Sequence, residues 1–178
     1  MERRVLVVQR DCPALLVPTG TPVTVPANTF VTLTQSLGGS YTIVVNGNMA
    51  RVDGTDADAL GLEPLRFDFP PPADDRVDIE QVWSVLRTIY DPEIPVSIVE
   101  LGLVYDCAIE RNGAKNTVRI ALTLTAPGCG MGPILIEDVK YRVACVPNVH
   151  DVQVDLVFDP PWTRDKMSDE AKLELGMF

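Results

Sequence analysis

The chain has 178 residues, 46% of them hydrophobic, and carries a formal net charge of −10. This length suffices for one large domain or two small ones, each able to bury a core. A chain this acidic, without a basic cluster, is poorly suited to bind nucleic acid or an anionic membrane, so we expect proteins or cations as partners. No apolar run reaches the roughly 18 residues of a membrane span, and Gln9, Arg10 and Asp11 end the first run too early for a signal peptide. These features predict a cytoplasmic protein.

Residues 1–69 are predicted to form a small all-β domain. Short runs rich in Val and Thr predict strands at residues 5–9, 22–25, 29–35, 41–45 and 48–52. Asn46-Gly47 lies between the last two and favours a two-residue hairpin turn with positive φ at both positions. Cys12 precedes Pro13, so we expect it in a loop or on an edge strand. The region shows no catalytic pattern, and docking is its default role.

Three consecutive prolines follow, Pro70-Pro71-Pro72. They cannot continue a helix or a central strand, so residues 70–76 are predicted to be a stiff linker. Residues 77–178 then form the second domain.

The second domain is predicted to be a compact α+β unit. Asp78 is a candidate N-cap for a helix that starts at Ile79 and ends near Tyr90. Strands at 101–109 and 117–125 are joined by a tight turn at Asn112-Gly113, and a long helix begins at Pro133. A third strand, from about residue 152 to 158, and a short helix after Ser168 complete the unit, giving the order helix, hairpin, helix, strand and C-terminal helix.

Cys129 lies between the second strand and the long helix, in the sequence TAPGCGMGP. Its glycine-rich turn would place the thiol at or just before a helix N-terminus, where unpaired N–H groups and the helix dipole favour a thiolate. A thiolate in that position is a metal ligand or a nucleophile; the alternative is a small residue in a tight turn. A second turn, Asp91-Pro92-Glu93, presents two carboxylates, although acids in turns are ordinarily solvated.

The other cysteines, Cys12, Cys107 and Cys145, form no Cys-x-x-Cys pair with Cys129 or with one another. This spacing argues against a disulfide framework and against a self-contained zinc site. We expect packing roles for Cys107, on the buried face of a strand, and for Cys145, beside Tyr141. A cysteine-ligated metal centre would need ligands from a second subunit, a small thiol or a partner.

Three separated segments carry a resemblance to a known family, in the right order: DPEIPVSIVELGLVY (91–105), TLTAPGCGMGP (123–133) and VFDPPWTRDKMSDEAKLELG (157–176). They resemble the MIP18-type domain of iron–sulfur cluster assembly proteins, and the whole chain, with residues 20–54 in front, is similar to bacterial assembly factors of this type. The resemblance implies a MIP18-type α/β-sandwich-like second domain, and a role in assembling iron–sulfur clusters or delivering them to client apo-proteins, with Suf assembly proteins as partners.

The resemblance also implies a set of site residues. Carried over by motif, these are Asp91, Glu93, Thr125 and Cys129, with Cys129, Asp91 and Glu93 as metal ligands. Some relatives have a second threonine where this chain has Ala126, and others have proline where it has Gly130. One thiol and two acids are too few soft ligands for a permanent cluster, so we expect a transient cluster or iron and no tightly bound cofactor.

Two other functions remain open. The chain could be a protein adaptor in which Cys129 is structural, or an enzyme with a cysteine nucleophile, although no convincing base accompanies the thiol. A metal shared across a two-fold axis would make a homodimer natural.

Overall fold

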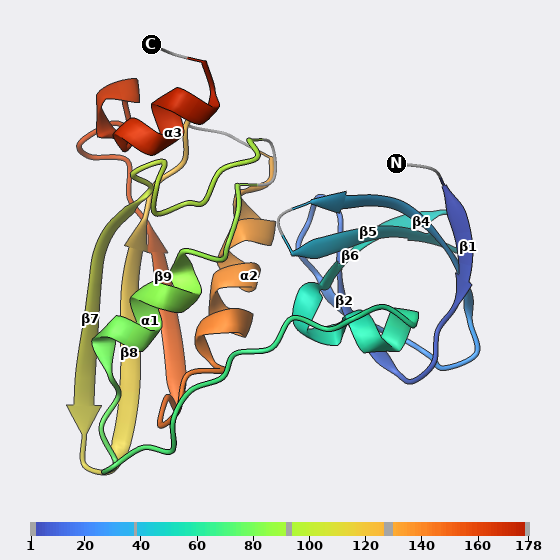
Figure 1. The fold of residues 1–178 in the computed structure, drawn as a ribbon, viewed down its shortest axis with the longest axis horizontal. Helices are drawn as coiled ribbons and strands as arrows, with labels where there is room; N and C mark the ends of the chain where they lie inside the picture. The colour runs from blue at the N-terminus through green and yellow to red at the C-terminus, as the bar shows by residue number, and fades with distance from the viewer. Residues whose placement is uncertain (1–2, 38, 92–93, 127–129, 177–178) are drawn as a thin grey trace. The chain divides into compact units, whose positions relative to one another are not determined.

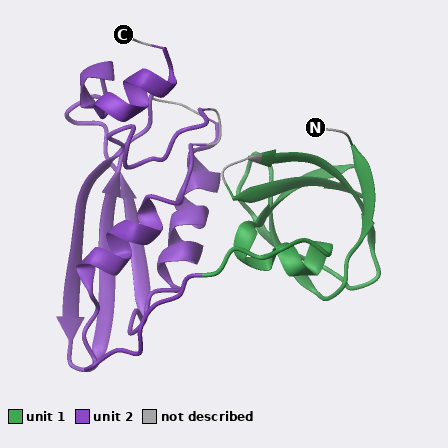
Figure 2. Ribbon diagram, viewed as in Figure 1, with its two compact units in different colours: residues 1–66 green, residues 67–178 purple. Residues whose placement is uncertain are grey.

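The computed structural model describes residues 3–37, 39–91, 94–126 and 130–176. The chain has a mixed α/β structure and divides into two compact units, residues 1–66 and 67–178 (Figure 2). The division lies a few residues before the prolines because Phe67 and Phe69 stack with ring centroids 6.0 Å apart and pack against the core of the second unit. Within the described ranges, every helix is too short or too polar to span a bilayer.

Unit 1 is a six-stranded antiparallel sheet with strand order β1-β4-β5-β6-β2-β3. The predicted hairpin is confirmed: Asn46 and Gly47 have φ of 51° and 79° between the paired residues Val45 and Asn48. A left-handed conformation at both positions suits the twist of a two-residue hairpin. The strands are β1 (Arg4–Val7), β2 (Cys12–Leu16), β3 (Pro22–Val25), β4 (Phe30–Leu37), β5 (Ser40–Val45) and β6 (Asn48–Asp53).

Strand β2 was not predicted, and Cys12, expected in a loop or on an edge strand, begins it and, among the described pairs, is paired only with Val25 of β3. Cys12 is fully buried, and β2 lies between β3 and β6. Pro13 is tolerated there because the described β6 pairs begin only at Leu15, so its missing N–H removes no bond to a second strand. Burial is the main cause that raises the pKa of the Cys12 thiol to about 11. This thiol is therefore part of the core.

A short 3-10 helix, η1 (Gly54–Leu60), closes unit 1 and was also not predicted. Asp53 caps it by accepting from the N–H of Thr55. Arg10 then fixes η1 to the sheet: its guanidinium donates to both carboxylate oxygens of Asp58 at 2.8 Å and to Asp56 at 2.9 Å. A bidentate geometry of this kind holds orientation as well as charge.

Unit 2 is built on a three-stranded sheet with order β7-β8-β9. Strands β7 and β8 form a hairpin. Strand β8 pairs in parallel with β9, and the long helix α2 connects these two strands along the chain. Figure 1 shows α1 and α2 over the same face of this sheet. The elements are α1 (Ile79–Leu86), β7 (Val104–Asn112), β8 (Lys115–Leu122), α2 (Gly132–Val143), β9 (Asp151–Leu156), η2 (Arg164–Lys166) and α3 (Asp169–Glu174).

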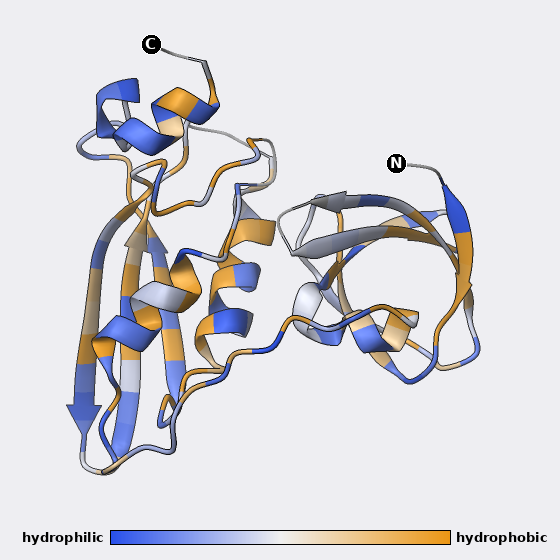
Figure 3. Ribbon diagram, in the orientation of Figure 1, coloured by the Kyte–Doolittle hydropathy of each residue, from blue (hydrophilic) through white to orange (hydrophobic). Residues whose placement is uncertain are grey.

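The core of unit 2 follows the sequence periodicities closely. Val118, Ile120 and Leu122 of β8 are at most 1% exposed, as the alternation predicts. Leu135 and Val139 lie on the buried face of α2, and Figure 3 shows hydrophobic and hydrophilic segments following one another along the helices. Burial of each such side chain contributes about 1.5 to 3 kcal/mol.

Candidate functional site

The structure describes two of the four site residues that the sequence predicts. Asp91 is 7% exposed, and Thr125 is half-buried, three residues beyond the end of β8. Cys129 and Glu93 lie outside the described residues.

Asp91 organises the turn that follows α1. Its backbone N–H donates to the Val96 carbonyl at 3.2 Å, and its Oδ1 accepts from the N–H of Ile94 at 3.0 Å. An isolated bridge between Tyr90 and Ser97 closes this turn. Asp91 is therefore not solvated as acids in turns ordinarily are. Its carboxylate is buried and accepts a backbone hydrogen bond within the turn.

Backbone hydrogen bonds connect the Asp91 turn to the end of β8. The Ile98 N–H donates to Ile89, the Leu103 N–H donates to Ile98 at 3.0 Å, and the Thr123 N–H donates to Leu103 at 2.8 Å. Figure 1 shows the segment after α1, the end of β8 and the start of α2 at the same end of the sheet. The structure thus brings Asp91 and Thr125 to one end of unit 2.

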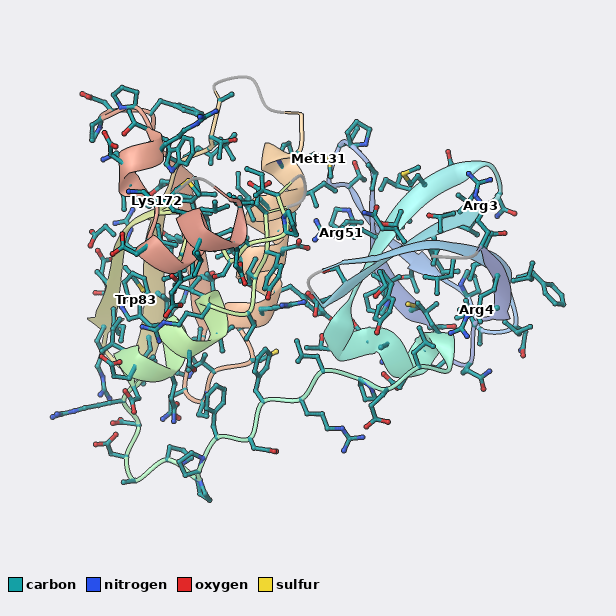
Figure 4. All side chains as sticks on the ribbon, turned by 45° about the horizontal axis from the view of Figure 1, so that its top comes forward. Arg3, Arg4, Arg51, Trp83, Met131 and Lys172 are labelled. Atoms are coloured by element: carbon teal, nitrogen blue, oxygen red, sulfur yellow. The ribbon has the colours of Figure 1, made fainter. Side chains whose placement is uncertain are left out.

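Helix α2 begins at this same end, at Gly132. Cys129 precedes it by three residues and, with residues 127 and 128, lies outside the described ranges. Met131 occupies the N-cap without a side-chain hydrogen bond, and Pro133 lies in the first turn, as predicted (Figure 4 labels Met131). Gly132 is buried, and a Cβ there would lie 3.1 Å from Leu124 Cδ1. The first N–H groups of α2, uncapped by any described side chain, favour negative charge nearby.

Thr123 alternates with Leu122 and Leu124 in the sequence, a pattern that favours a position on the polar face of a half-buried strand. It is fully buried, and its Oγ1 has no hydrogen-bond partner among the described residues. Thr123 lies one residue beyond the end of β8, and its N–H donates to the Leu103 carbonyl. No sequence signal marks this change, and a buried hydroxyl without a described partner is rare enough to identify this strand end as unusual.

The C-terminal segment holds the stretch from Ser97 to Leu103 in place. Trp162 Nε1 donates to the Leu101 carbonyl at 2.7 Å, and the Ser168 N–H donates to Glu100 at 2.8 Å. Gly102 has φ of 75°, and a Cβ on it would lie well inside contact distance of the Lys166 carbonyl. The Trp162 indole, for which no sequence signal indicated a partner, thus supports the segment that carries the Asp91 turn.

The other described thiols have different environments. Cys107 is half-buried and packs against the core rather than being fully buried, and desolvation, with the nearby charge of Asp106 second, raises its pKa to about 11. The packing role expected for Cys145 is wrong, because it is exposed just beyond the C-terminal end of α2.

The described residues form no metal site by themselves. No group of three His, Cys, Asp or Glu side chains in the described ranges could hold a metal ion. His150 Nδ1 accepts from the backbone N–H of Asn116 at 3.0 Å, so this imidazole supports the start of β9. Cys129 and Glu93 lie outside the residues that this search covers.

Known proteins similar to this chain match it over unit 2. The family model described as "Iron-sulfur cluster assembly protein" matches residues 79–156. An Fe-S protein maturation auxiliary factor from Porphyromonas gingivalis is 47% identical over 54% of this chain and 90% of its own length. The Fe-S protein maturation auxiliary factor SufT from Staphylococcus aureus is 43% identical over 50% of this chain and 98% of its own length.

A solved structure shows the same likeness. A crystal structure of a domain of unknown function from Bacillus anthracis superposes with a TM-score of 0.50 at 37% identity, covering 56% of this chain and 92% of that one. These alignments thus cover at least 90% of each relative but only about half of this chain. The chain belongs to the MIP18-type family of iron–sulfur cluster assembly proteins.

Proposed function

We propose that the chain is an accessory factor, and not an enzyme, that helps to assemble iron–sulfur clusters or to transfer them to client proteins. One observation carries this proposal: relatives at 43 to 47% identity, aligned over at least 90% of their own length, are named Fe-S protein maturation auxiliary factors. Similarity at this level over a whole domain supports a shared role far better than a shared fold would.

The proposed site comprises Cys129, Asp91, Glu93 and Thr125. Its support is the placement of Asp91, Thr125 and the start of α2 at one end of the unit 2 sheet. A thiolate on Cys129 would supply a soft ligand for iron, and the carboxylates of Asp91 and Glu93 would supply harder, more exchangeable oxygen ligands. Thr125 would contribute a hydroxyl beside them.

Two opposing effects would act on the proposed Cys129 thiolate. The uncapped N–H groups at the start of α2 favour negative charge, whereas nearby carboxylates oppose it until a cation arrives. A site of this kind would bind iron or a cluster as cargo and release it again. We propose Suf assembly proteins and client apo-proteins as its partners, with a homodimer wherever two chains share one metal.

We place this activity in the cytoplasm. The cysteine spacing, with no Cys-x-x-Cys pair, argues against a disulfide framework and supports this placement.

The test is client maturation in bacteria that lack the gene for this chain. Wild-type chain should restore the activity of an iron–sulfur enzyme, and Cys129→Ser should not, although the variant accumulates and folds normally. Cys145→Ser is the matched control, because Cys145 is exposed and lies away from the proposed site at the far end of α2. Full rescue by Cys129→Ser would favour the adaptor function, and no rescue by the wild type would overturn the proposal.

Asp91→Asn separates the structural role of this residue from its proposed role as a ligand. The amide keeps an oxygen that can accept from the Ile94 N–H, so the turn should persist, whereas the charge for iron is lost. Reduced client activity with unchanged stability of unit 2 would support ligation; wild-type activity would assign Asp91 to the turn alone.

A further inference from the structure

Strand β1 is an edge of the unit 1 sheet. Among the described strands it pairs only with β4, with Leu6 opposite Val31 and Val7 opposite Phe30. The Val8 N–H donates to Thr29 on the β4 side. Because successive residues of a strand direct their N–H and C=O to opposite sides, those of Val5 and Val7 point toward the open edge. The open edge therefore presents main-chain donors and acceptors that another strand could use.

Gln9 supports this assignment of the edge. Its side-chain Nε2 donates to the Val7 carbonyl at 3.3 Å, which is a long bond between exposed groups. A local side chain thus takes the place that a neighbouring strand would fill. Such a contact is readily exchanged for a ladder bond.

Exposed apolar side chains lie beside this edge on the outer face of the sheet. Val5 is 67% exposed and Phe30 is 71% exposed, which is unusual for an aromatic side chain. The pairing register places Val5 opposite Thr32, then Val44 and then Met49, so the row continues across four strands. We call the four exposed members of this face the edge patch; they are Val5, Val7, Phe30 and Met49.

Two basic residues lie at the start of β1, and by strand alternation Arg4 belongs to the face opposite to Val5. Arg3 and Arg4 are exposed and have no ion-pair partner among the described residues (Figure 4). Arg10, farther along the chain, is already bound to Asp56 and Asp58. In Figure 3, β1 accordingly changes from hydrophilic at its start to hydrophobic along its length. This edge thus combines open main-chain groups, apolar surface and two arginines for which the described residues offer no ion-pair partner.

We propose that β1 and the edge patch bind an extended segment of a partner protein, with alternating apolar residues and acidic residues at its C-terminal end. The segment would add as an antiparallel strand, place its apolar side chains beside Val5 and Val7, with Phe30 one strand further in on the same face, and bring its acids to the start of β1 that carries Arg3 and Arg4. This docking site lies in unit 1 and is independent of the proposed iron site.

Charge and edge geometry favour this occupant over the alternatives. A second copy of the chain would present the same arginines and no complementary acids. An anionic membrane would contact the apolar face and leave the edge N–H and C=O groups of Val5 and Val7 unused. Two arginines alone are also a poor footprint for nucleic acid.

The test uses full-length protein and a short synthetic peptide of alternating Val and Thr that ends in two glutamates. Saturable binding is expected, with slowed hydrogen exchange at the Val5 and Val7 amides. A peptide with lysines in place of the glutamates should bind at least tenfold more weakly. Arg3→Glu combined with Arg4→Glu should reverse this preference.

Two variants with matched exposure test the surface itself. Phe30→Ser should raise the dissociation constant for the peptide about tenfold, as expected for a central apolar contact. Leu173→Ser on α3 is the control, because Leu173 is 69% exposed but lies outside the patch, and it should change the constant less than twofold.

A third variant tests the hydrogen bonds of the edge. Val7→Pro removes an edge-facing N–H and should abolish the slowed hydrogen exchange on peptide binding, while leaving unit 1 folded.

Several results would overturn this inference. These are no saturable binding, equal affinity for the lysine peptide, or equal losses in Phe30→Ser and Leu173→Ser. Binding to phosphatidylglycerol vesicles without binding to the peptide would assign the patch to membranes instead. Self-association that Val7→Pro abolishes would assign it to a second copy of the chain.

Discussion

Replacing Gly102 by alanine should destabilise unit 2 and release the C-terminal segment from the stretch that carries the Asp91 turn. Gly102 has φ of 75°, which costs an alanine about 1 to 2 kcal/mol. The new Cβ would also lie 2.8 Å from the Lys166 carbonyl carbon, and this neighbour is backbone and cannot move as a flexible side chain would. The bonds from Trp162 to Leu101 and from Ser168 to Glu100 would then weaken, each contributing about 1 kcal/mol. The total is about 3 kcal/mol.

Gly113→Ala is the matched control for this prediction. Gly113 has φ of 61° in the β7–β8 turn, but nothing lies within 4 Å of an added Cβ, so only the backbone cost of about 1 to 2 kcal/mol applies. Both tryptophans of the chain, Trp83 and Trp162, belong to unit 2, so fluorescence-detected urea unfolding reports on this unit alone. Equal losses of stability in the two variants would refute the proposed role of the Gly102 contact.

Three further predictions concern packing, pH and thiol reactivity. Arg142 is 1% exposed and donates to the carbonyl of Thr88 at 2.7 Å, so Arg142→Met should cost unit 2 about 2 kcal/mol in the same urea assay; no loss would contradict this role. The guanidinium of Arg10 lowers the pKa of Asp58, so this contact stabilises unit 1 above about pH 4, and the stabilisation is lost as the pH falls through the lowered pKa. The stability difference between wild type and Arg10→Met, measured by circular dichroism, should therefore shrink from pH 7 to pH 3, and a constant difference would argue against it. Among the three described thiols, mass spectrometry should find exposed Cys145 alkylated first by iodoacetamide. Cys12 and Cys107 should react slowly at neutral pH, because each has a pKa of about 11. Below that pKa, their rates of alkylation should rise about tenfold for each unit by which the pH is raised.

Local periodicity and turn chemistry predicted much of the fold. Asp78 caps α1, Ser168 caps α3, and Asn46-Gly47 forms its hairpin, because each of these signals acts through bonds within a few residues. The buried face of α2 follows from a spacing of three to four residues.

Features that depend on distant contacts were not visible in the sequence. Strand β2 contains a proline, and its buried residues, Cys12 and Ala14, pack in a core that residues from four other strands complete. Thr123 is fully buried although it alternates with Leu122 and Leu124, and its N–H donates to Leu103, twenty residues earlier in the chain. The grouping of Asp91 with Cys129 came from the family resemblance and not from residue spacing, since spacing carries no information on how two distant turns meet.

The most direct test of the proposed iron site is anaerobic incubation of the purified chain with ferrous iron and sulfide, followed by visible absorption and iron analysis. The account predicts that wild type and Cys145→Ser acquire absorbing iron and release it to an apo-protein client, whereas Cys129→Ser acquires little. Equal binding by Cys129→Ser and wild type would contradict the assignment of this thiol as the iron ligand.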